Sequence, residues 1–138
     1  MPTPSFTYFD HDADIGVTGT GPTLESAFVA AAEGMFAIMV DIKAVASQQC
    51  VDIEFEEADV ELALVTWLNL LLTEARESRM VFSHFQLTRQ TTHWQGRACG
   101  EPWHAGMERG TEVKGATLTM LSVKQTDHGW KACCVVDV

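Results

Sequence analysis

The chain ends in Trp130-Lys131-Ala132-Cys133-Cys134-Val135-Val136-Asp137-Val138, a stretch that is apolar on both faces of an extended strand. Such a strand lies inside a sheet, because other elements must cover both of its faces. We therefore predict that this last strand is central. Its tip bears the side chain of Asp137 and the α-carboxylate of Val138, and burying two negative charges is unfavourable unless a cation compensates them.

A second acidic group stands near the other end of the chain, in Asp10-His11-Asp12-Ala13-Asp14-Ile15-Gly16. Alternate residues of an extended segment point the same way, so Asp10, Asp12 and Asp14 are expected to share a face. If the first and last strands are neighbours, these carboxylates meet the C-terminal ones and form a set of oxygen donors suited to Ca²⁺ or Mg²⁺. The run alone fits a solvated turn equally well. It is not an EF-hand, because the glycine required at the sixth position is Ile15.

Composition limits the class of protein. The chain has 138 residues, which suits a single domain over 1–138, and its formal net charge is −10. This charge repels a phosphate backbone, so the expected partner is a cation or a protein with a basic surface rather than nucleic acid. No apolar run is long enough to span a membrane. The four cysteines form no Cys-x-x-Cys pair, so disulfides are not expected and a reducing cytoplasm is the predicted location.

Hydrophobic periodicity predicts an α+β fold with the order ββαβα followed by several antiparallel strands, and with two helices packed on a β-sheet. The first helix follows the capping residue Thr23, and the second runs from Asp59 to about Ser78. The strands are expected at 6–10, 13–20, 49–55, 82–88, 92–99, 112–124 (with a bulge near Met120) and 130–138.

The sequence contains no motif of a known catalytic centre: it has no Gly-rich phosphate loop, nucleophile elbow or H-E-x-x-H. Lys114 precedes an apolar stretch and is either a counter-charge for the acidic groups or an edge-strand lysine that limits aggregation. A metal-dependent hydrolase that uses the carboxylates to activate water remains an alternative.

The chain resembles the archease family in a series of blocks that occur in order along nearly its whole length. The blocks are 8–16, Thr23-Leu24-Glu25-Ser26-Ala27-Phe28, Met35-Phe36, Trp67-Leu68-Asn69-Leu70-Leu71, Gly100-Glu101, Gly110-Thr111-Glu112-Val113-Lys114-Gly115-Ala116-Thr117 and Val136-Asp137-Val138. The first block, the lysine-containing block and the last block are specific only when taken together.

The resemblance implies that the protein is not an enzyme but an accessory protein of the tRNA-splicing RNA ligase. Archeases promote guanylylation of the ligase from GTP and allow it multiple turnovers. The family binds a divalent cation, typically Ca²⁺ with Mg²⁺ or Mn²⁺ as alternatives, and the implied ligands here are Asp14, Asp137 and Val138. Lys114 corresponds to a functionally important lysine of the family.

Two positions depart from the family pattern. Asp12 stands where threonine is usual, which adds an acidic group to the expected site. Leu118-Thr119 replaces the usual Tyr-His after the lysine block, in the part of the protein expected to face the partner. A second interpretation of the resemblance is a chaperone-like module that binds RNA-processing enzymes.

Overall fold

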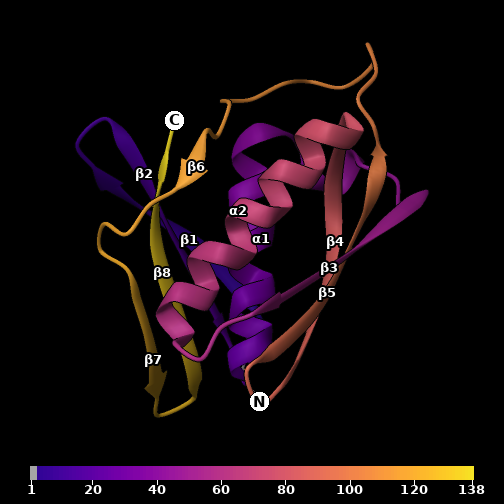
Figure 1. Ribbon diagram of the computed structural model, residues 1–138. Coiled ribbons are helices and arrows are strands. Elements are labelled where there is room, and N and C mark those ends of the chain that lie inside the picture. The colour runs from indigo at the N-terminus through magenta and orange to yellow at the C-terminus, as the bar shows by residue number, and fades with distance from the viewer. Residues whose placement is uncertain (1–2) are drawn as a thin grey trace.

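Two antiparallel sheets enclose two helices in the computed structural model, which describes residues 3–138 (Figure 1). The first sheet has the order β1-β2-β8-β6, with β7 also paired to β8, and the second has the order β3-β5-β4. The strands are β1 Ser5–His11, β2 Asp14–Gly21, β3 Gln49–Glu56, β4 Met80–Gln90, β5 His93–Pro102, β6 Gly115–Ala116, β7 Ser122–Thr126 and β8 Gly129–Asp137. The helices are α1 Leu24–Met39, the short 3₁₀ helix η1 Ile42–Ala44 and α2 Val60–Ser78.

The predicted α+β class, the order ββαβα and the central position of the last strand are confirmed. The strands form two sheets rather than one, and the reason lies in α1. This helix is buried on almost every side, at Leu24, Ala27, Phe28, Ala30, Ala31, Ala32, Gly34, Met35 and Phe36. A helix that is apolar all round must be covered on more than one side, and the second sheet supplies that cover.

Both helices begin where the sequence predicts. The hydroxyl of Thr23 accepts a hydrogen bond from the backbone N–H of Ser26, and the side chain of Ser26 accepts one from the backbone N–H of Thr23, which completes a capping box. Asp59 caps α2 by accepting hydrogen bonds from the backbone N–H groups of Glu61 and Leu62 at 2.8 and 3.1 Å.

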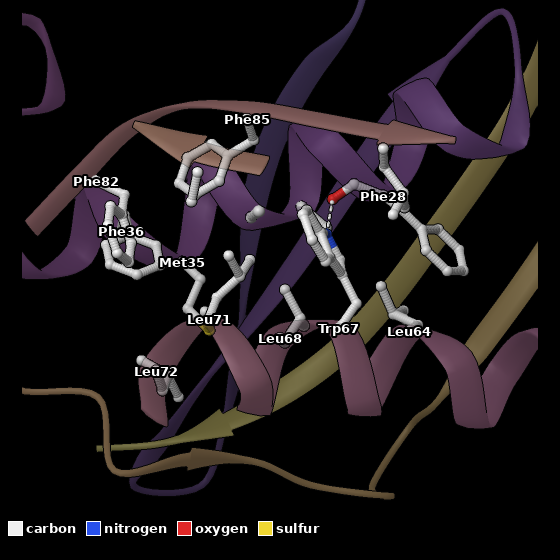
Figure 2. Packing of buried hydrophobic residues seen from close by; sticks show 14 of the residues in the cluster. Phe28, Met35, Phe36, Leu64, Trp67, Leu68, Leu71, Leu72, Phe82 and Phe85 are labelled. Atoms are coloured by element: carbon white, nitrogen blue, oxygen red, sulfur yellow. Dashed lines mark hydrogen bonds between the residues drawn. The ribbon is translucent and has the colours of Figure 1, made fainter. Parts of the chain in front are cut away.

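Trp67 of α2 lies at the centre of the hydrophobic core between the helices and the second sheet (Figure 2). Its ring is fully buried, and its Nε1–H donates a hydrogen bond of 3.1 Å to the carbonyl of Phe28 in α1. Gly96 in β5 leaves room for the ring, because a Cβ at that position would overlap it. Truncating such a tryptophan to alanine costs about 3–5 kcal/mol, so this contact fixes the two helices and β5 relative to one another.

The predicted strand over 112–124, with its bulge near Met120, is confirmed only in part. Only Gly115–Ala116 and Ser122–Thr126 pair with β8, and a turn separates them. Thr117 accepts a hydrogen bond from the backbone N–H of Thr119 through its hydroxyl, and Met120 has a left-handed φ of 55°. Local side-chain hydrogen bonds of this kind compete with a continuous strand. β6 and β7 nevertheless run in the same direction along β8: Ala116 lies opposite Val136 and Ser122 opposite Cys133. Residues 117–121 therefore face only residues 134–135, and the phase slip near Met120 marks an enlarged bulge.

The expected absence of disulfides is wrong. Cys50 in β3 and Cys99 in β5 lie directly opposite each other in the second sheet and form a disulfide, while Cys133 and Cys134 are free. The pairing joins strands that are 49 residues apart in sequence, and neither cysteine belongs to a local motif that would reveal it. Within residues 3–138, no helix combines the length and apolarity needed to cross a membrane.

Candidate functional site

The tip of the β1–β2 hairpin and the C-terminal residues meet at one end of the first sheet. β8 pairs with β2 on one side, where Val136 lies opposite Ile15, and with β6 on the other, where Asp137 lies opposite Gly115. Continuing the β2–β8 register by one step places Asp14 beside Asp137. Figure 1 shows the C-terminus between the tip of the β1–β2 hairpin and β6. The acidic segment near the start of the chain therefore lies beside the C-terminal residues as predicted, but the neighbour of the last strand is the second strand, β2, and not the first.

Two hydrogen bonds hold this edge of the sheet together. The backbone N–H of Val138 donates to Oδ1 of Asp14 at 3.3 Å, and the backbone N–H of Lys114 donates to the carbonyl of Asp137 at 2.7 Å. The side chain of Asp14 is half-buried, whereas Asp137 and Lys114 are exposed. We call Asp14, Lys114, Asp137 and Val138 the acidic edge. It combines two side-chain carboxylates with a lysine on an adjacent segment.

Asp12 lies outside this arrangement. The chain reverses at Asp12 and Ala13, and Asp12 has a left-handed φ of 52° with a side chain that is 93% exposed. Asp14 pairs with His11, so it shares a face with His11, and Asp10 points to the opposite face. The expectation that the three aspartates share one face is therefore wrong, because the segment is a hairpin turn and not a single extended strand.

The donor atoms at the acidic edge are of the type that a hard cation prefers. Asp14 and Asp137 offer carboxylate oxygens, which calcium and magnesium prefer. Among residues 3–138, no group of three or more histidine, cysteine, aspartate or glutamate side chains is placed to hold a metal ion. A cation at this edge therefore needs a main-chain donor beside the two side chains, and the carboxylate of Val138 is the nearest one in sequence.

Two residues of α2 position the segment that bears Lys114. Asn69 makes a reciprocal pair of hydrogen bonds with Ala116 in β6: its Nδ2–H donates to the carbonyl at 3.2 Å, and its Oδ1 accepts from the backbone N–H at 2.9 Å. Arg76 donates from Nη2 to the carbonyls of Val113 and Lys114 at 3.0 and 2.6 Å. The sequence did not reveal these roles. The only signal was a polar Asn69 within an otherwise apolar helical seam.

A family model, the Archease protein family, matches residues 6–138 of this chain. The archease of Thermococcus gammatolerans is 35% identical over 137 residues, and the match covers 95% of this chain and 96% of the relative. The archease of Methanosarcina barkeri is 32% identical over 139 residues, covering 96% and 95%. The chain belongs to the archease family, and the resemblance seen in its sequence blocks is confirmed.

Solved structures show the same fold. The solution structure of protein 1598 from Methanobacterium thermoautotrophicum has a TM-score of 0.82 at 30% identity, and the match covers 97% of this chain and 99% of that one. A crystal structure from Thermotoga maritima, described as an archease and possible chaperone, has a TM-score of 0.66 at 17% identity and covers 100% and 98%. This second likeness concerns the fold alone.

Proposed function

We propose that this archease is a non-catalytic accessory protein that activates the tRNA-splicing RNA ligase. In this proposal it promotes guanylylation of the ligase by GTP and allows multiple turnovers. Membership of the family supports an accessory role. The net charge of −10 supports a protein partner rather than direct contact with RNA, and the proposal locates both proteins in the cytoplasm.

The observation behind the proposal is the hydrogen bond from Val138 to Asp14, which joins the C-terminal residue to the β1–β2 hairpin, so that carboxylates of both segments lie together. In the proposed site, Asp14, Asp137 and the α-carboxylate of Val138 hold a divalent cation, with Ca²⁺ the best suited and Mg²⁺ or Mn²⁺ as alternatives. A bound cation supplies positive charge that phosphate oxygens can approach. No histidine or cysteine is part of this donor set, which favours a hard cation over zinc.

Lys114 is the proposed partner-facing residue. Its backbone is tied to Asp137, and its side chain is exposed at the same edge. An ammonium group next to the carboxylates is suited to bind phosphate or an acidic group of the ligase. Asp12, exposed at the hairpin tip, adds a negative charge toward a basic surface near the active site of the partner.

The test measures guanylylation and multiple-turnover joining by the ligase in the presence of wild-type protein or of variants. We expect Asp137→Asn and Lys114→Ala to lose most of the stimulation. Lys124→Ala is the matched control, because Lys124 is also exposed and lies on β7, which pairs with β8, but away from the acidic edge. Undiminished stimulation by both Asp137→Asn and Lys114→Ala would remove the proposal.

A chaperone-like binding module is the second candidate. Leu118 and Met120 in the turn after β6 are 66% and 61% exposed, and exposed apolar side chains of this kind can bind unfolded clients. The description of the Thermotoga maritima protein as a possible chaperone agrees with this reading. Suppression of the aggregation of an unrelated client, lost in Leu118→Ser and Met120→Ser, would favour it over ligase activation.

A further inference from the structure

A pocket of about 740 Å³ lies where the C-terminal end of α2 meets the start of β4 and the segment between β5 and β6. Figure 1 shows that segment, in orange, passing over the end of α2. Arg76, which lines the pocket, also donates to the carbonyl of Lys114 at the acidic edge. The apolar surface of the pocket comes mainly from the half-buried side chains of Met39 and Trp103, behind which Phe36, Leu72 and Met80 are buried. Ligand sites of small molecules have this character: concave, mostly apolar and about 300–1,000 Å³ in volume.

The residues that line the pocket carry a positive net charge, whereas the net charge of the whole chain is negative. Three of the five arginines of the sequence, Arg76, Arg79 and Arg109, line it, against one acidic residue, Glu112. Within residues 3–138, no carboxylate lies within 4.0 Å of any of the three guanidinium groups. The pocket is therefore a locally positive, uncompensated site in a protein whose net charge is −10.

Two of these arginines are free to bind an anion. Arg76 uses Nη2 for the carbonyls of Val113 and Lys114, but Arg79 and Arg109 make no side-chain hydrogen bond within residues 3–138. The guanidinium of Arg109 stacks on the ring of Trp103, with Cζ 4.0 Å from the ring centroid. Stacking orients the planar group and leaves its N–H edges available, which suits bidentate binding of a carboxylate.

The backbone at Arg79 indicates that the fold does not require an arginine there. Arg79 caps α2 in the left-handed region, with φ 56° and ψ 39°, a position that glycine normally occupies at the end of a helix. A side chain at this position opposes the local conformation. Arg79 nevertheless lines the pocket together with Arg109.

We propose that this pocket binds a small amphipathic anion, with an apolar or aromatic body against Trp103 and Met39 and a single carboxylate held by Arg79 and Arg109. A polyanion such as a nucleoside triphosphate or RNA is disfavoured, because the field of the remaining molecule repels each additional negative charge. The arginines stabilise a single carboxylate by charge-assisted hydrogen bonds, and the apolar body of the ligand is removed from water. The inference does not depend on the proposed action on the ligase.

Calorimetric titration of the full chain tests the proposal with matched probes. Indole-3-acetate and decanoate supply an aromatic and an aliphatic body with one carboxylate, and their neutral amides lack the charge. We expect at least one acid to bind about tenfold more tightly than its amide, since a charge-assisted hydrogen bond is lost with the amide. The tighter of the two acids identifies the kind of body that the pocket accepts.

Substitutions of the two arginines test whether the acid binds in this pocket. Arg109→Gln and Arg79→Gly are each expected to weaken binding of the acid by about tenfold. The glycine at position 79 relieves the left-handed conformation, so this variant keeps the fold. Arg89→Gln is the matched control, because Arg89 also lies over a tryptophan, Trp94, at 5.1 Å, but outside the pocket. Equal binding of acid and amide, an equal loss in Arg89→Gln, or no binding of either acid at about 1 mM would overturn the proposal.

Discussion

The backbone N–H of Val138 lies 3.3 Å from Oδ1 of Asp14, a contact between residues 124 positions apart in the sequence. It exists because β8 follows every other element in the chain and yet pairs with β2, the second strand. The contact places main-chain and side-chain oxygen atoms of the β1–β2 hairpin and the C-terminal residues at the acidic edge. Any change there is expected to alter cation binding before it alters the core.

Cation affinity is the direct readout of the metal site proposed at the acidic edge. We expect Asp137→Asn to weaken Ca²⁺ binding by about tenfold or more, because a neutral amide replaces one of the carboxylate ligands. A short extension after Val138 is expected to weaken it as well, because the α-carboxylate becomes an amide. Calorimetry with Ca²⁺ measures both effects.

The control for this titration is Asp127→Asn, which removes an equal charge in the turn between β7 and β8. It is expected to leave Ca²⁺ affinity nearly unchanged. A similar loss of affinity in both aspartate variants would mean that net charge, and not a defined site, governs binding.

Arg76 is expected to order the segment that bears Lys114. Arg76→Gln removes hydrogen bonds to the carbonyls of Val113 and Lys114, and we expect a loss of about 1 kcal/mol in the free energy of unfolding. The amide hydrogen of Lys114, which is bonded to Asp137, should exchange faster with solvent.

Urea denaturation and hydrogen exchange check this prediction, with Arg89→Gln as the control on the other sheet. Unchanged protection of the Lys114 amide in Arg76→Gln would show that β8 and Asn69 hold the segment without Arg76.

The helices could be predicted almost to the residue, whereas the pairing of distant elements could not. Thr23 and Asp59 are local signals, because a cap acts on backbone groups two or three residues away. The disulfide between Cys50 and Cys99 depends on the register between β3 and β5, and no local pattern states which strands are neighbours. The arginine pocket could not be predicted for the same reason, since Arg79 and Arg109 come to line one pocket only in the folded chain.

The disulfide is expected to stabilise the protein mainly by restricting the unfolded chain. Cys50→Ser is predicted to lower the free energy of unfolding by about 2–4 kcal/mol under oxidising conditions. Reduction with dithiothreitol should lower the stability of the wild type by a similar amount and leave that of Cys50→Ser unchanged. Mass spectrometry of alkylated protein counts the free thiols, and four of them in protein purified without reductant would contradict the prediction.

Glu33 gives the stability of the protein a defined dependence on pH. Its carboxyl is half-buried, and burial raises its pKa above the ordinary value of 4.5, with a smaller opposing effect of His84. Below the pKa that Glu33 has in the unfolded chain, its protonated carboxyl makes its full contribution to stability. This contribution is lost as the pH rises through the pKa of Glu33 in the folded protein. Glu33→Gln should therefore be more stable than the wild type at neutral pH, and the difference should vanish below about pH 4.

Glu56 provides the opposite case in the same experiment. Hydrogen bonds from His93 and then from Thr92 lower the pKa of its carboxyl. The ionised carboxyl of Glu56 contributes to stability above the pKa that Glu56 has in the unfolded chain. This contribution is lost as the pH falls through the pKa of Glu56 in the folded protein. Glu56→Gln should be less stable than the wild type at neutral pH. Thermal unfolding between about pH 4 and 8 compares the two, and shifts of the same sign in both variants would contradict the assignments.

The place of β8 in the sheet also has a consequence for biosynthesis. Until the ribosome has released residues beyond Gly129, the β1–β2 hairpin has an unpaired edge along β2, and β6 and β7 have no strand to join. Nascent chains that stall before that point present open β-edges to one another, which is a route to aggregation. Synthesis of the final strand thus acts as the closing step of folding, and premature termination there is expected to yield a chain that quality-control proteases remove.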